Sequence, residues 1–161
     1  MRYLLALSLS FFMAFTVHAE VVRKQSFGAL DVHYNIFSST FLQPETAKAV
    51  GLNRSKNQAV LNVSMVKEAK GQKGTVTGHF KNLLGQIETL TFSEVDEGDA
   101  VYYLAQFAIT GQEILRFEVQ VTDSDGKTHL LKFTQEVFPD LWKSSSSPAI
   151  TQGNCANCKP Y

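Results

Sequence analysis

The stretch Leu30-Asp31-Val32-His33-Tyr34-Asn35-Ile36 alternates apolar and polar side chains without a break. Successive side chains of a β-strand point to opposite faces, so this alternation predicts a strand with one buried face and one face in solvent. The stretch from Ala59 to Val66 also places an apolar residue at every odd-numbered position. Both stretches therefore predict half-buried strands of an antiparallel sheet.

The same pattern predicts five further strands, at about 75–82, 87–95, 100–109, 114–122 and 128–137. Turn-forming residues separate them, and twelve Phe and five Tyr favour strands over helices. Short strands with regular turns predict an all-β fold, an immunoglobulin-like antiparallel β-sandwich of about seven to nine strands. Periodicity shows which side chains share a face but not how a sheet closes, so a barrel stays open as an alternative.

One short helix is expected to interrupt the strands. Pro44 suits the first turn of a helix, the residues up to Val50 can complete it, and Gly51 can end it. The helix lies within a connection of about nineteen residues, from Ser39 to Asn57. Connections of this length in a compact domain often carry function, although an ordinary crossover between two sheets would also explain it.

Residues 1–19 have the features of an export signal. Arg2 supplies a positive start, the run from Leu4 to Val17 is apolar, and Val17-His18-Ala19 precedes the expected cleavage point at Glu20. The apolar run is too short for a membrane span, and we expect none in the mature chain. We therefore expect a periplasmic protein with a signal peptide at 1–19, a β-sandwich domain at 20–143 and a tail at 144–161.

The net charge of the chain indicates which kinds of binding partner are unfavourable. Fifteen basic and fifteen acidic residues become fourteen and fifteen once Arg2 is removed. This near-neutral balance argues against nucleic acid and anionic membrane surfaces as partners. The sequence also carries no motif that indicates a cofactor.

The tail combines a flexible linker of four serines, residues 144–147, with the only two cysteines, in Cys155-Ala156-Asn157-Cys158. This spacing occurs in zinc sites and redox dithiols, but a zinc site needs two more ligands and a thioredoxin-type dithiol needs a helix N-terminus. A local disulfide between Cys155 and Cys158 is the simplest expectation. Soft-metal capture or thiol exchange by the same pair is the alternative.

Catalysis finds little support in the sequence. The mature chain has three histidines, His33, His79 and His129, and no acid or nucleophile pattern accompanies them. We interpret them as solvent-facing strand residues and expect a protein that is not an enzyme.

Acidic residues crowd two turns, 94–99 and 123–126, that would emerge at one end of a simple up-and-down arrangement. Calcium binding there is weakly indicated, because Asp and Gly also occur in tight turns without a metal.

The opposite end is the predicted binding surface. The Ser39–Asn57 connection and the turns at 83–86 and 110–113 would gather there, together with Gln112. Apolar anchors beside Arg and amide side chains are typical of protein and peptide recognition. The candidate residues are Phe41, Leu42, Arg54, Lys56, Asn57 and Gln86. The alternative is that Phe41 and Leu42 plug the core while Arg54 and Lys56 are solvated.

Two resemblances extend these predictions. The stretch Glu97–Tyr103 resembles the corner of immunoglobulin domains in which a tyrosine hydroxyl bonds back to the preceding loop. The chain from about Val21 to Pro139 resembles the bacterial secreted family catalogued as domain of unknown function 4426. The stretches that carry this second resemblance are His33-Tyr34-Asn35, Ser39-Thr40-Phe41-Leu42 with Pro44, Arg54-Ser55-Lys56-Asn57, Leu61-Asn62-Val63-Ser64, Asn82-Leu83-Leu84-Gly85-Gln86 and Glu97-Gly98-Asp99-Ala100 with Tyr102-Tyr103. The resemblance implies a secreted all-β protein of Gram-negative bacteria and no particular activity.

The function that these features predict is a periplasmic, non-enzymatic binding or accessory module. It would recognise a protein, peptide or envelope component through the loops at one end. The alternative is a metal-handling or thiol-handling role of Cys155 and Cys158.

Overall fold

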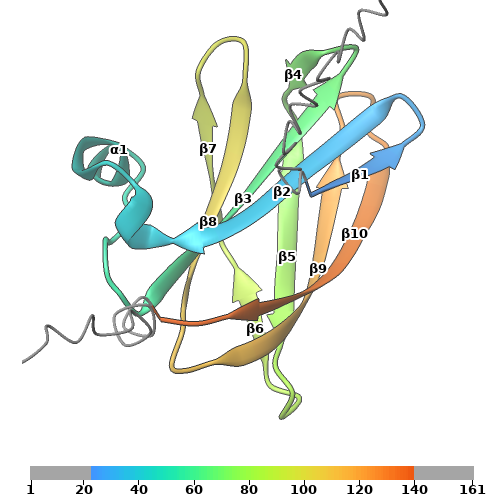
Figure 1. Ribbon diagram of the computed structural model, residues 1–161. Coiled ribbons are helices and arrows are strands. Elements are labelled where there is room, and N and C mark those ends of the chain that lie inside the picture. The colour runs from blue at the N-terminus through green and yellow to red at the C-terminus, as the bar shows by residue number, and fades with distance from the viewer. Residues whose placement is uncertain (1–22, 140–161) are drawn as a thin grey trace, which may run out of the picture.

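Two antiparallel sheets pack face to face in the computed structural model, which describes residues 23–139 (Figure 1). The first sheet has the order β1 (Lys24–Phe27), β2 (Leu30–Ser38), β3 (Gln58–Lys67), β8 (Val101–Ala108) and β7 (Phe92–Asp96), with β4 (Lys70–Gln72) also paired to β3. The second sheet has the order β10 (Thr128–Val137), β9 (Glu113–Thr122), β5 (Thr75–Lys81) and β6 (Ile87–Leu90). The predicted all-β sandwich is confirmed.

The strand order agrees with the immunoglobulin-like prediction. The order β2-β3-β8-β7 facing β10-β9-β5 corresponds to strands A, B, E and D facing G, F and C of an immunoglobulin domain. Residues 23–139 form ten strands, more than the seven to nine predicted, and the sequence pattern missed the two short strands β1 and β4, of four and three residues. The predicted strand at 87–95 is also two strands, because the chain leaves the second sheet after Leu90 and enters the first sheet at Phe92.

The core lies between the sheets and is built from the inward-facing residues that the alternation predicts. Phe117 of β9 stands at its centre, with 1% of its surface exposed. Its ring stacks on Phe133 of β10 with centroids 4.8 Å apart, and the rings of Phe80 and Phe107 lie 5.5 and 5.6 Å away. This aromatic cluster joins β5, β9 and β10 of the second sheet to β8 of the first.

A buried tyrosine forms a second link between the sheets. Tyr103 on β8 is 4% exposed, and its hydroxyl accepts a hydrogen bond from the backbone N–H of Gly74 at 2.9 Å. The same hydroxyl lies 3.1 Å from the Gly74 carbonyl oxygen and 3.2 Å from Glu94 Oε2, either of which can accept its proton. Burial raises the pKa of this phenol. The predicted immunoglobulin corner is wrong, because the hydroxyl bonds Gly74, 29 residues upstream, and Tyr103 lies in the strand equivalent to E rather than F.

The long connection runs between neighbouring strands of one sheet, so it is not a crossover between sheets. It contains a 3-10 turn, η1 (Ser39–Phe41), and the predicted helix, α1 (Pro44–Ala49), which starts at the proline and is followed by Gly51 at φ 70°. The connection is tied to the first sheet by Asn53, whose N–H donates to Gln106 Oε1 at 3.0 Å and whose carbonyl accepts from Gln106 Nε2. Ala47 of the helix is buried.

Candidate functional site

Three segments meet at one end of the sandwich, which we call the loop end. They are the Ser39–Asn57 connection, the β5–β6 turn at 82–86 and the β8–β9 turn at 110–112. Figure 1 shows the β5–β6 turn at the bottom of the molecule and the β7–β8 hairpin at the top. Two hollows open at the loop end, and Glu136 near the end of β10 lines both.

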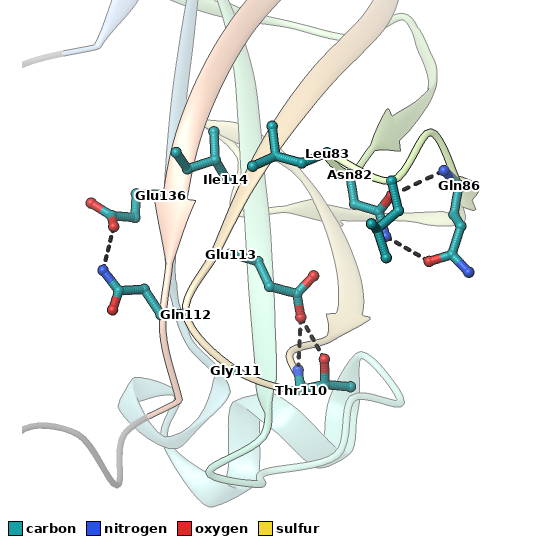
Figure 2. Close-up of a pocket in the computed structure, with 10 residues that line it drawn as sticks. Asn82, Leu83, Gln86, Thr110, Gly111, Gln112, Glu113, Ile114 and Glu136 are labelled. Atoms are coloured by element: carbon teal, nitrogen blue, oxygen red, sulfur yellow. Dashed lines mark hydrogen bonds between the residues drawn. The ribbon is translucent and has the colours of Figure 1, made fainter.

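The first hollow has a volume of about 510 Å³ and lies between the β5–β6 and β8–β9 turns (Figure 2). Its walls carry three exposed apolar side chains, with 64% of Leu83, 86% of Leu84 and 40% of Ile114 exposed. Amide and carboxylate groups of Gln86 and Glu113 complete the rim. The hollow therefore combines an apolar wall with hydrogen-bonding groups at its edge.

Hydrogen bonds fix both turns around this hollow (Figure 2). The side chain of Asn82 accepts from the Gln86 backbone N–H at 2.9 Å and donates to Gln86 Oε1 at 2.7 Å. Across the hollow, Glu113 Oε1 accepts from the Thr110 hydroxyl at 2.5 Å, and Gln112 Nε2 donates to Glu136 Oε1 at 2.6 Å. These hydrogen bonds hold the turns in place, so the side chains of Leu83 and Leu84 remain exposed to solvent.

The second hollow, of about 210 Å³, lies between the connection and the end of β10. Phe41 and Phe138 line it and are 70% and 41% exposed. Lys56 places a positive charge in the same wall, and Ile109 forms part of its apolar lining. The hollow thus offers aromatic surface next to one cation.

Two contacts hold the connection in place beside the second hollow. Ser39 is fully buried, and its hydroxyl donates to the Ser55 carbonyl and accepts from the Ser55 N–H, both at 2.9 Å. The Arg54 guanidinium donates from Nη2 to the Thr40 carbonyl at 3.0 Å. The start and the end of the connection are therefore joined, which orients the intervening Phe41.

The predicted site residues divide into two groups. Phe41, Lys56 and Gln86 line the hollows, and Phe41 does not plug the core. The other three make hydrogen bonds that hold the connection. The Arg54 guanidinium donates to the Thr40 carbonyl, and the Leu42 backbone N–H donates to the Ser39 carbonyl. The backbone carbonyl of Asn57 accepts from the Ile109 N–H at 2.8 Å. Whether any of them binds a partner stays a prediction.

Sequence reasoning missed four apolar residues of this end: Leu83, Leu84, Ile114 and Phe138. The paired leucines carried a usable signal, because large apolar residues seldom occupy a turn that ends in glycine. Ile114 and Phe138 carried none, since each continues an ordinary strand pattern.

The opposite end places its acidic groups against cations. Lys73 Nζ lies 2.5 Å from Asp96 and 3.5 Å from Glu94, and Lys67 Nζ lies 2.7 Å from Asp125. Asp123 accepts from the backbone N–H groups of Asp125 and Lys127, as turn aspartates do without a metal. Within residues 23–139, no three His, Cys, Asp or Glu residues are grouped so that they could hold a metal ion.

Asp96 is expected to make the fold sensitive to acid. Its hydrogen bond to Lys73, helped by the N–H of Gly98, holds the pKa of the carboxyl below its usual value. The stabilisation is therefore complete above about pH 4 and is lost as the pH falls through the lowered pKa. We expect Asp96→Asn to reduce the loss of stability between pH 5 and pH 2, measured by urea unfolding. Glu97→Gln is the control, because it removes a charge from the same turn but keeps the Lys73–Asp96 pair; an equal effect of both would contradict the prediction.

The three histidines lie on separate strands. His33 is on β2 of the first sheet, and His79 and His129 are on β5 and β10 of the second. His129 Nε2 lies 3.2 Å from Asp123 Oδ2, and its ring packs 4.8 Å from that of Phe27. His129 therefore has a structural role, joining the β9–β10 turn to β1.

Two sequence predictions fall outside the described residues: the signal peptide at 1–19 and the Cys155–Cys158 pair. Metal capture, thiol exchange and a disulfide at that pair stay predictions. Within residues 23–139, no helix is long and apolar enough to cross a bilayer.

Comparison with known proteins agrees with the fold. A DUF4426 family protein from Pseudomonas aeruginosa PAO1 has a crystal structure that is 45% identical in sequence, with a TM-score of 0.71 over 74% of this chain and 96% of that one. FetP from uropathogenic Escherichia coli strain F11 is 12% identical, with a TM-score of 0.52 over 73% of this chain and 94% of its own, and shares the fold. No curated protein matches the sequence. The profile of the domain of unknown function DUF4426 matches residues 24–140, which confirms the predicted resemblance: the chain belongs to the DUF4426 family.

Proposed function

We propose that the domain is a periplasmic, non-enzymatic binding module that takes an apolar segment of an envelope protein or peptide at the loop end. One observation carries this proposal. Seven large apolar side chains are exposed in the part of the chain that the structure describes, and five of them line the two hollows. Those five are Phe41, Leu83, Leu84, Ile114 and Phe138.

The physical basis is that exposed apolar surface costs free energy in water and is recovered when a partner covers it. Single exposed apolar residues are common, but a group of five at one end of a small domain supports an interaction site there. The rim groups add direction, since Gln86, Glu113 and Lys56 can pair with the backbone or charges of a bound segment. The predicted periplasmic location agrees with a ligand from the envelope.

The role of Arg54 changes in this proposal. The sequence predicts that Arg54 contacts the partner directly. In the proposed site Arg54 instead holds Phe41 in position, because its guanidinium donates to the carbonyl of the preceding residue, Thr40. Its substitution would then weaken binding through Phe41 rather than through a lost contact.

Crosslinking in the periplasm, followed by mass spectrometry, tests the proposal. We expect Leu84→Ser and Phe41→Ala each to lower the recovery of a crosslinked partner at least about tenfold, because truncation of a central apolar anchor costs more than about 1.4 kcal/mol. Both residues are highly exposed, at 86% and 70%, so the fold should be unaffected.

Ile87→Ser is the matched control, because Ile87 is 63% exposed but lies outside both hollows. An equal loss of the partner with Ile87→Ser, or full recovery with both loop-end variants, would contradict the proposal. Cys155→Ser with Cys158→Ser separates it from the alternative, because a binding module keeps its partner without the thiols.

A further inference from the structure

Strand β10 is an edge strand of unusual length for this domain. It runs ten residues, Thr128–Val137, and ends the order of the second sheet, so no strand pairs with its outer side within residues 23–139. The other strands that end a sheet, β1, β6 and β7, have four, four and five residues. The backbone groups along the outer side of a long edge strand can pair with a further strand.

Part of the solvent-facing row of β10, the five residues after Thr128, has a symmetric composition. This part consists of Leu130, Lys132, Thr134, Glu136 and, directly after the strand, Phe138. Its two apolar ends are similarly exposed, at 42% for Leu130 and 41% for Phe138. A basic residue and an acidic residue stand at equal distances on either side of the central threonine. When two copies of this row are placed antiparallel and centred on Thr134, each basic residue therefore faces an acidic one and each apolar residue faces an apolar one.

We propose that β10 is the pairing surface for a second copy of this chain, which adds its own β10 in antiparallel orientation with the two Thr134 residues at the twofold axis. In this register Lys132 of each copy faces Glu136 of the other, and Leu130 faces Phe138. Opposite charges and apolar-aromatic pairs directly across two strands are favourable contacts. The interface is isologous, so each contact occurs twice.

Other registers are less favourable. Residues that face each other across an antiparallel pair lie on the same face of the sheet, so the axis passes through a residue of the strand. An axis at Lys132 or at Glu136 would place like charges opposite each other. An axis at Phe133 would place Leu130 opposite Glu136, and an axis at Gln135 would place Lys132 opposite Phe138. Thr134 alone among these positions matches charge with charge and apolar with apolar.

Lys132 and Glu136 each have a partner within their own chain, but both can form a further hydrogen bond to the second copy. Lys132 Nζ lies 2.8 Å from Glu118, and Glu136 Oε1 accepts from Gln112 at 2.6 Å. The Lys132 and Glu118 side chains are 58% and 43% exposed. An ammonium has three donors and a carboxylate two acceptor oxygens, so both groups can take a further partner.

Pairing would also change the loop end. The two second sheets would form one continuous sheet across both copies, and Lys132 of the second copy would stand beside Glu136, which lines both hollows. Because Leu130 of the second copy would also lie opposite Phe138 of the second hollow, each copy would add a positive charge and an apolar side chain to the rim of the binding site of the other.

Sedimentation equilibrium of the chain purified from the periplasm tests the pairing. We expect a dimer whose dissociation constant rises at least about tenfold in Lys132→Glu and in Glu136→Lys, because each variant sets two like-charge pairs opposite each other. The double variant Lys132→Glu with Glu136→Lys restores opposite charges and should recover the wild-type constant. Circular dichroism checks that each variant is folded.

A disulfide provides a second readout, in a chain with Cys155→Ser and Cys158→Ser. Thr134→Cys should crosslink two copies on mild oxidation, since the two cysteines meet at the axis. Lys132→Cys should not crosslink, because position 132 faces position 136 of the other copy and the two introduced cysteines would lie four residues apart along the strands. A mass of one chain up to millimolar concentration, a dimer insensitive to the single charge reversals, or equal crosslinking of both cysteine variants would each overturn the proposal.

Discussion

Replacing Phe117 with alanine is expected to lower the free energy of unfolding by about 3–5 kcal/mol. The ring is 1% exposed and stacks on Phe133 at 4.8 Å with an angle of 8° between the planes. It also contacts Phe107 across the sandwich. Truncation removes the buried apolar area and leaves a cavity that the two hydrogen-bonded sheets cannot close.

Equilibrium unfolding in urea measures this effect, with the slope of the transition expected to stay constant because the folded surface is unchanged. Phe41→Ala is the matched control: the same atoms are removed from a side chain that is 70% exposed, and the change should stay within about 0.5 kcal/mol. A loss below about 1 kcal/mol in Phe117→Ala would contradict the central place of this ring in the core.

Replacing Gly74 with alanine is expected to destabilise the fold by about 3 kcal/mol, at the upper end for a small-to-large change. A Cβ atom at Gly74 would lie 2.1 Å from the carbonyl oxygen of Thr122, and a backbone atom cannot swing aside as a long side chain can. Moving the Gly74 backbone away from Thr122 would strain or break its hydrogen bonds with the buried Tyr103 hydroxyl. The link between β8 and the β4–β5 segment would then be lost together with the close packing.

Gly111→Ala is the control for this substitution, because no atom in the described part of the chain lies within 4 Å of a Cβ at that turn position. Its effect on the urea midpoint should be small. Tyr103→Phe removes the hydroxyl alone and should cost about 1 kcal/mol, because the part-buried N–H and carbonyl of Gly74 lose this partner. If the two sites act as one link, the double variant Gly74→Ala with Tyr103→Phe will cost less than the sum of the single variants. Full additivity would show that the contacts are independent.

The strand faces are the part of the fold that the sequence predicts best. Ala59, Leu61, Val63 and Met65 are at most 1% exposed, as their alternation predicts. The change of sheet between Leu90 and Phe92 left no trace in the pattern, because residues on both sides of Thr91 pack against the same core. Period-two alternation records which face is covered but not which sheet the strand has joined.

The candidate site could be predicted only as a region. The loops at one end were expected to gather, and Phe41, Lys56 and Gln86 do line the hollows there. The sequence could not show that Arg54 holds the connection rather than contacting a partner. Its hydrogen-bond partner is the backbone carbonyl of Thr40, fourteen positions away, which leaves no pattern in the sequence. Phe138 and Ile114 read as strand residues, and they are exposed because no residue between 23 and 139 covers them at the end of the sandwich.

The sequence by itself determined the all-β class, the buried face of each main strand, the short helix and the family, because these follow from side-chain order along the chain. Tertiary structure alone decided which strands share a sheet, that Tyr103 reaches Gly74, and that five exposed apolar side chains meet at the loop end. Those features depend on which segments become neighbours in space, and contacts between residues distant in the chain leave no local pattern.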